Sequence, residues 1–298
     1  MTTTEARSGR ARRPDDDLQV TRNDAGRAQD PGEDAPTQAP PRRTSSRSPL
    51  GWVLRLFGLP VFLAVVCAAL YLYVESGREE NGGAGYGSIE ARFIDRQRLT
   101  EAVQVHVELV LVSTLLTLLV AVPAGILLSR RGRISQVVGG PVLAVANIGQ
   151  AVPSFGVLAL LAVYSGIGFG AAFVGLFLYA LLPILRNTIV GLQQVDESVV
   201  EAARGMGLSR WQVLQAVELP LAVPVALAGV RTALVINVGT ATVATLIGAG
   251  GLGDIVYGGI KNNRDVVLVI GAVMTGVLAL TVDHVAGLVE EWLTPRGL

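Results

Sequence analysis

The sequence is poor in the residues from which metal and redox sites are usually built. Its 298 residues include two histidines and one cysteine, and only 16% of them are charged. The single Cys67 excludes an intrachain disulfide and a cysteine-based metal cluster. Neither His106 nor His284 has a partner residue at metal-ligand spacing. We therefore predict that the chain has no metal site.

A nucleotide-binding loop is also missing from the sequence. A P-loop needs a glycine-rich turn that ends in Lys-Ser or Lys-Thr, and the only lysine, Lys261, is followed by Asn262. The segment Pro153-Ser154-Phe155-Gly156 is not a nucleophile motif, and no base lies near Ser154 in the sequence. We predict that the chain has no catalytic residue, is not an enzyme and binds no cofactor of its own.

Apolar residues, by contrast, are abundant. They make up 51% of the chain, which is high for a soluble domain of this length and favours a lipid bilayer as the solvent. The 24 basic residues balance the 24 acidic ones, so the net charge gives no reason to expect nucleic acid as a partner.

The N-terminal part divides into a polar segment and an apolar run. Residues 1–48 contain no aromatic residue and are rich in Arg, Asp, Pro, Thr and Ser, which predicts a disordered tail. The first apolar run, 56–74, follows Arg47 and Arg55 and precedes Glu79 and Glu80. The positive-inside rule then predicts a cytoplasmic N-terminus.

The remaining apolar runs predict about six transmembrane helices in total. Residues 134–185 carry no charge, and one helix over them would be roughly 78 Å long, against a hydrocarbon core of about 30 Å. We predict two spans there, joined by an outer turn at the glycine-rich residues 165–170. The other predicted spans cover 109–128, 219–247 and 266 to about 288. The expected fold class is therefore all-α, a polytopic membrane helix bundle with both termini in the cytoplasm.

An inner loop at 187–218 contains signals for a helix–turn–helix hairpin. Ser198 with Glu201, and Ser209 with Gln212, have the spacing of capping boxes at the starts of two short helices. Gly207 lies between them, where a left-handed helix stop is expected. A hairpin joined to a membrane helix can transmit the motion of a docked partner to the bundle.

The motif in this loop resembles that of a known family. Glu201-Ala202-Ala203, then Gly207, then Val217-Glu218-Leu219-Pro220 resembles the EAA loop of ABC importer permeases, with Val217 where isoleucine is usual. The segments QAVPSFGVLALL, LFLYALLPILRNTIVGL and ATLIGAGGLGDIVYGGI resemble permeases of osmoprotectant importers for glycine betaine, choline or proline-like solutes. The resemblance covers roughly residues 104–290.

The resemblance implies a type I, methionine-permease-like fold for residues 104–290, and the composition and apolar runs divide the rest of the chain into further parts. These would be a cytoplasmic tail at 1–48, an extra N-terminal transmembrane helix at 49–75, an extracytoplasmic linker at 76–103, a permease domain at 104–290 with its coupling loop at 187–220, and a cytoplasmic C-terminal tail at 291–298. The implied setting is the inner membrane of a bacterium.

The resemblance also implies partners and coupling residues. The partners would be ABC ATPase subunits that bind ATP and Mg, a second permease subunit, identical or not, and an external solute-binding protein. The residues that would couple to the ATPase are Glu201, Ala202, Ala203, Gly207, Leu219 and Pro220.

Polar and helix-breaking residues within the spans are candidates for the substrate pathway, because lipid does not tolerate irregular or charged groups. These candidates are Asn147, Gln150, Pro153, Ser154, Tyr179, Arg231 and Thr240. All of these except Tyr179 and Arg231 belong to two polar clusters: the first comprises Asn147, Gln150, Pro153 and Ser154, and the second comprises Thr240, Thr242 and the glycines at 248, 250, 251 and 253. Tight packing of small residues is the alternative for both clusters. For Arg231, the alternative is a structural ion pair with a carboxylate or a contact with helix-end carbonyls.

Three alternative functions stay open at this point. The same machinery could import methionine or another amino acid. An ion-coupled secondary transporter would need no ATPase, but it would favour intramembrane charge pairs and an internal repeat, and no convincing repeat is present. A membrane anchor or receptor with an interaction loop would leave the polar clusters without a role.

Overall fold

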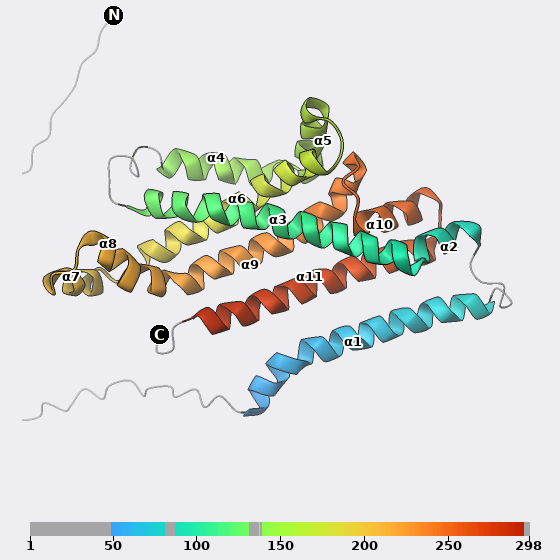
Figure 1. Ribbon diagram of the computed structural model, residues 1–298, viewed down its shortest axis with the longest axis horizontal. Coiled ribbons are helices and arrows are strands. Elements are labelled where there is room, and N and C mark those ends of the chain that lie inside the picture. The colour runs from blue at the N-terminus through green and yellow to red at the C-terminus, as the bar shows by residue number, and fades with distance from the viewer. Residues whose placement is uncertain (1–48, 81–86, 131–136, 138, 295–298) are drawn as a thin grey trace, which may run out of the picture. The chain divides into compact units, whose positions relative to one another are not determined.

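The computed structural model describes residues 49–80, 87–130, 137 and 139–294, which form helices and turns without a strand (Figure 1). The all-α fold class is thereby confirmed. The α-helices are α1 (Pro49–Glu80), α2 (Ser88–Ile94), α3 (Arg96–Ser129), α4 (Gly140–Ala151), α5 (Ser154–Ser165), α6 (Phe169–Gln193), α7 (Glu197–Gly205), α8 (Arg210–Val213), α9 (Leu219–Ala244), α10 (Leu252–Lys261) and α11 (Asp265–Leu293). A π-helical turn, η2 (Leu214–Glu218), precedes α9, and a 3₁₀ turn, η3 (Thr245–Ile247), follows it.

Five helical segments among the described residues are long and apolar enough to cross a membrane. They are Leu56–Ser76, Arg96–Ser129, Phe169–Gln193, Arg210–Ile247 and Asp265–Leu293. They account for five of the predicted spans, and the segment predicted as the third span forms the short helices α4 and α5. Pro153 separates these two helices, because it has no N–H to donate and holds Val152 in an extended conformation (ψ 132°).

The second predicted span begins earlier than hydropathy indicates. α3 starts at Arg96 because the Asp95 side chain accepts hydrogen bonds from the N–H groups of Gln97 (3.1 Å) and Arg98 (3.3 Å). The predicted linker at 76–103 therefore contains the end of α1, all of α2 and the start of α3, while residues 81–86 lie outside the described part. The predicted tail at 1–48 and residues 295–298 also lie outside it.

Helices α3, α6 and α9 pack together as the core of the bundle. Small residues allow the close approach of α6 and α9. A Cβ atom added to Gly191 would lie 2.9 Å from the carbonyl oxygen of Ala222, and one added to Gly229 would lie 2.6 Å from that of Pro183. Packing of this kind is typical of membrane helices, which associate through van der Waals contact rather than through burial from water.

The two ends of the bundle are built from different segments (Figure 1). At one end, the Gly168 N–H donates to the carbonyl of Ile247 (2.7 Å), which joins the two glycine-rich turns that the sequence places on the same side. At the other end lie α7 and α8, together with the end of α3. The glycine-rich turns and the hairpin thus belong to different ends of the bundle.

Candidate functional site

The hairpin predicted at the inner loop consists of α7 and α8, and its first helix begins differently from the prediction. The N-cap of α7 is Asp196, whose carboxylate accepts a hydrogen bond from the Ser198 N–H (2.9 Å). The predicted capping box of Ser198 with Glu201 is therefore wrong, since both residues lie inside the helix. The hydrogen bonds from the backbone and side chain of Ser198 hold the pKa of the Asp196 carboxyl below its usual value.

The turn and the start of the second helix follow the prediction. Gly207 has φ +87°, and the Leu208 N–H after it donates to the Ala203 carbonyl (3.3 Å). The capping box of Ser209 and Gln212 is confirmed, with the Ser209 N–H donating to Gln212 Oε1 (2.9 Å) and the Gln212 N–H to Ser209 Oγ (3.4 Å). Local hydrogen bonds thus determine where α7 and α8 begin and how the chain turns between them.

The hairpin has a small apolar core of its own. Val200, Ala203 and Val213 are buried there. Ala203 therefore packs inside the hairpin, whereas Glu201 and Ala202 are exposed. Two large apolar side chains, Met206 (76% exposed) and Trp211 (64% exposed), extend the exposed surface. An apolar core beneath such a surface makes the hairpin a small rigid unit suited to docking a protein.

The hairpin continues into the membrane helix without a break. Arg210–Ile247 is one helical run, so Leu219 and Pro220 do not start a separate helix but lie where η2 passes into α9. In η2, the Leu219 N–H donates to the Leu214 carbonyl, and Pro220 has no N–H with which to continue the ladder. A displacement of α8 therefore reaches α9 through the π-helical turn η2.

Several predicted pathway residues meet at the break between α4 and α5. The Tyr179 hydroxyl on α6 donates to the carbonyl of Val152 (2.6 Å), a group left free by the break. Ser154 is half-buried at the start of α5, Pro153 is exposed, and Asn147 is exposed on α4. The side chain of Gln150 lies outside the described part. The structure thus joins Tyr179 to the first polar cluster, while Arg231 and Thr240 lie on α9.

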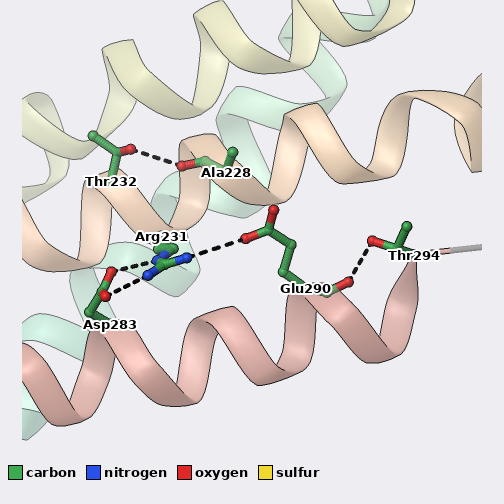
Figure 2. A network of polar contacts seen from close by, with 6 residues as sticks. All are labelled: Ala228, Arg231, Thr232, Asp283, Glu290 and Thr294. Atoms are coloured by element: carbon green, nitrogen blue, oxygen red, sulfur yellow. Dashed lines mark hydrogen bonds and ion pairs between the residues drawn. The ribbon is translucent and has the colours of Figure 1, made fainter. Parts of the chain in front are cut away.

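Arg231 lies in an ion-pair network between α9 and α11 (Figure 2). Its Nε and Nη2 atoms each lie 2.5 Å from an oxygen of Asp283, and Nη1 lies 3.9 Å from Glu290 Oε2. Gly287 makes room for the guanidinium, since a Cβ atom there would lie 3.2 Å from Nη1. This geometry favours the structural ion pair that the sequence left open. Thr240, by contrast, is buried (6% exposed).

Two buried polar side chains, His106 and Asn237, make contacts that the sequence did not predict. His106 is 1% exposed; its Nδ1 accepts the Leu252 N–H (3.3 Å), and its Nε2 therefore carries the proton donated to the Val238 carbonyl (3.1 Å). Asn237 is fully buried, and its Nδ2 donates to the hydroxyls of Ser113 (3.3 Å) and Thr114 (3.0 Å). Their partners lie more than a hundred positions away, and no local pattern points to them.

Taken together, five described helices long and apolar enough to cross a membrane, with a compact helical hairpin at one end of the bundle, define a polytopic membrane protein. The model of the family described as "Binding-protein-dependent transport system inner membrane component" matches residues 121–296. This chain belongs to that family, and it is a membrane-spanning permease subunit of an ABC importer of the osmoprotectant type. Membership implies ATPase and substrate-binding partners and the inner membrane of a bacterium.

The curated relatives and a solved structure agree with this assignment. The osmoprotectant import permease protein OsmY of Salmonella typhimurium is 43% identical over 214 residues, which cover 72% of this chain and 89% of that protein. The carnitine transport permease protein OpuCD of Listeria monocytogenes is 42% identical over 178 residues, covering 59% of this chain and 78% of that protein. An inward-facing structure of the MetNI methionine ABC transporter has a TM-score of 0.59 and 26% identity, covering 67% of this chain and 98% of that chain.

Proposed function

We propose that this permease carries a small compatible solute, such as glycine betaine, choline, carnitine or proline, into the cell. The observation that carries this proposal is the identity of about two residues in five to permeases named for such solutes. One of them is the glycine betaine/carnitine/choline permease protein OpuCB of Bacillus subtilis, which is 38% identical over 193 residues. The methionine transporter MetNI supports methionine import as a second candidate, but its 26% identity is lower.

The proposed assembly places two permease subunits side by side in the membrane, identical or not. Two ATPase subunits bind ATP and Mg on the cytoplasmic side, and this chain binds neither. An external binding protein delivers the solute. The N-terminus, the hairpin and the C-terminus face the cytoplasm, and the glycine-rich turns face outward. In this arrangement α1 is an extra span outside the permease domain at 104–290. Residues 1–48 and 291–298 are the cytoplasmic N-terminal and C-terminal tails of the chain.

Coupling in this proposal passes through the hairpin. Glu201 and Ala202 are exposed on α7 and contact the ATPase, while Ala203 stabilises the hairpin from inside. Gly207 sets the turn, and Leu219 with Pro220 carries the motion of the hairpin into α9. Because α9 packs closely on α6, the closure of the ATPases shifts both helices together.

The solute pathway follows the irregular parts of the bundle in this proposal. The interruption at Val152–Pro153 places free backbone groups at membrane depth, which is tolerated only where they are buried in protein or line a cavity. Asn147, Gln150 and Ser154 flank this point, and Tyr179 contacts it. Thr240 and Arg231 extend the proposed pathway along α9, and Arg231 acts there through its pair with Asp283.

Uptake into proteoliposomes tests the proposal. The permease is reconstituted with its ATPase and binding protein, with ATP inside, and uptake of radiolabelled glycine betaine is measured against an excess of choline, carnitine, proline or methionine. We expect ATP-dependent uptake that compatible solutes reduce and methionine does not. Methionine uptake without glycine betaine uptake would favour the second candidate. Uptake driven by an ion gradient without ATP would contradict the coupling mechanism.

A further inference from the structure

An ion pair joins the end of α3 to the base of the hairpin. Arg130, the residue after the last turn of α3, places Nη2 3.3 Å from Oε2 of Glu218, the last residue of η2. The Glu218 side chain is 14% exposed and that of Arg130 is 35% exposed, so the carboxylate is the more enclosed partner. Glu218 occupies the unspecified position between Val217 and Leu219 in the EAA pattern. The pattern therefore assigns it no role.

The ion pair between Arg130 and Glu218 connects the hairpin to a helix that is not its neighbour in sequence. The chain enters the hairpin from α6 and leaves it into α9, so α6 and α9 are linked to the hairpin covalently, whereas α3 is far from it in sequence. Arg130 and Glu218 link α3 to it through space. The positive charge of Arg130 also lies at the C-terminal end of α3, where the helix dipole favours a cation.

The π-helical turn η2, which ends at Glu218, is a place where the helix can bend, and the ion pair can oppose that bending. η2 interrupts the regular α-helical ladder between α8 and α9. An interrupted ladder is a place where a helix bends more readily, and π-turns are frequent at functional sites. If the helix bent at η2 when the ATPases moved the hairpin, part of the displacement would not reach the membrane. A contact that holds Glu218 against α3 opposes such bending.

We propose that Arg130 and Glu218 are positioning residues for ATP-coupled transport. Their ion pair fixes the base of the hairpin to α3, so that a displacement of the hairpin moves α3 together with α9 instead of bending η2. The side chain of Thr188 on α6 packs against Gly125 on α3, where a Cβ atom would lie 2.7 Å from Thr188 Cγ2, so a shift of α3 is also passed to α6. This inference rests on the proposed role of the hairpin as the contact with the ATPase.

A similar ion pair at the other end of the bundle is a matched control. Arg264 Nη1 lies 3.0 Å from Glu90 Oε1, with side chains 43% and 13% exposed. The two pairs thus have comparable length and exposure, but the Glu90 pair has no contact with the hairpin. Partly exposed pairs contribute little to stability in general, so neither substitution should unfold the protein. A difference in coupling between variants of the two pairs therefore reflects where each pair lies, because both substitutions remove a charge.

The test uses the assembled transporter in proteoliposomes and compares glycine betaine uptake with the rate of ATP hydrolysis. We expect Glu218→Gln and Arg130→Gln each to lower uptake per ATP by about three- to tenfold, within the range by which single residues change coupling. Glu90→Gln should keep the wild-type ratio. The exchanged pair Arg130→Glu with Glu218→Arg should recover the ratio to within about twofold, because it restores an ion pair between the same two positions.

Three results would overturn the proposal. Unchanged uptake per ATP in both single variants would show that the pair does not take part in coupling. An equal loss in Glu90→Gln would point to general destabilisation, and failure of the exchanged pair would show that the two charges do not act together. Failure of the proposed function looks different. In that case a disrupted turn at Gly207 would also leave coupling unchanged, whereas a coupling loss at Gly207 alone would refute only the role of the ion pair.

Discussion

Replacement of Gly207 by valine should uncouple ATP hydrolysis from transport. Gly207 has φ +87°, a conformation that a β-branched residue adopts only with strain. No atom lies within 4 Å of a Cβ added there, so the cost comes from the backbone alone. A non-glycine residue in this region costs about 1–3 kcal/mol, which corresponds to a roughly 5- to 150-fold change in the population of the native turn.

Gly205 offers a matched control for this substitution. It is the last residue of α7, its φ is not positive, and no atom lies within 4 Å of an added Cβ. Valine is tolerated in a helix about as well as glycine, so Gly205→Val should leave the turn unchanged. The two variants place the same side chain two positions apart, and only one of them strains the turn.

The assay measures glycine betaine uptake beside ATP hydrolysis in proteoliposomes, with co-purification of the ATPase as a check on assembly. We expect uptake per ATP to fall at least about fivefold in Gly207→Val, the lower end of the population change above, and to stay near wild type in Gly205→Val. Because the hairpin has its own core, membrane insertion should be normal in both. Wild-type coupling in Gly207→Val would refute the argument that the turn geometry transmits force.

Three further changes test other parts of the molecule. Because the pKa of Asp196 in the folded protein is lowered, its cap on α7 is complete above pH about 4 and is lost as the pH falls through the lowered value. Hydrogen-exchange protection of α7 should therefore fall at that low pH in the wild type and should already be low at pH 7 in Asp196→Ala. Equal protection of α7 at pH 7 in the wild type and in Asp196→Ala would contradict this. His106→Ala leaves the buried Leu252 N–H without the partner it has in the wild type, at about 1–3 kcal/mol, whereas the Val238 carbonyl still accepts from the Thr242 hydroxyl. The Tm in detergent and the protection of the Leu252 amide should therefore fall, and an unchanged Tm would refute the bridge. Asp283→Asn should lower the Tm by about 2–4 °C, and adding Arg231→Gln should restore part of it, because the cation that has lost its main partner is then removed; a lower Tm in the double variant would show that the ion pair itself stabilises α11.

The sequence predicted features that depend on local or periodic signals. Long apolar runs predicted the membrane helices, and the hairpin followed from Gly207 and from the capping box at Ser209 and Gln212. The first cap was misassigned because Asp196 and Ser198 are both good N-cap residues only two positions apart. The carboxylate of Asp196 is the group that captures the Ser198 N–H, so the helix begins at Glu197. Choosing between such neighbours requires the path of the preceding chain.

Features that depend on contacts distant in sequence could not be predicted. In the sequence, His106 could be assessed only as a metal ligand, but its partners are backbone groups on α9 and α10, whose approach depends on the whole fold. Arg231 was recognised as unusual because of its depth, yet the sequence alone could not choose Asp283 as its partner. Pro153 divides one predicted span into α4 and α5. Whether a proline breaks a helix in a membrane depends on whether a neighbouring side chain can bind the carbonyl that it leaves free, as Tyr179 binds that of Val152 here.

Cross-linking of the hairpin to the ATPase is the most direct test of the central claim. A single cysteine replaces Met206, which is 76% exposed on the hairpin, in a Cys67→Ser background, and a control variant carries the cysteine at Tyr164, which is 86% exposed in the last turn of α5. After treatment with a short reagent that joins a thiol to an amine, we predict that the Met206 variant forms a covalent adduct with a lysine of the ATPase, and that the yield of this adduct changes when ATP is bound. The Tyr164 variant should form none. An adduct with the ATPase from Tyr164 but not from Met206 would contradict the account.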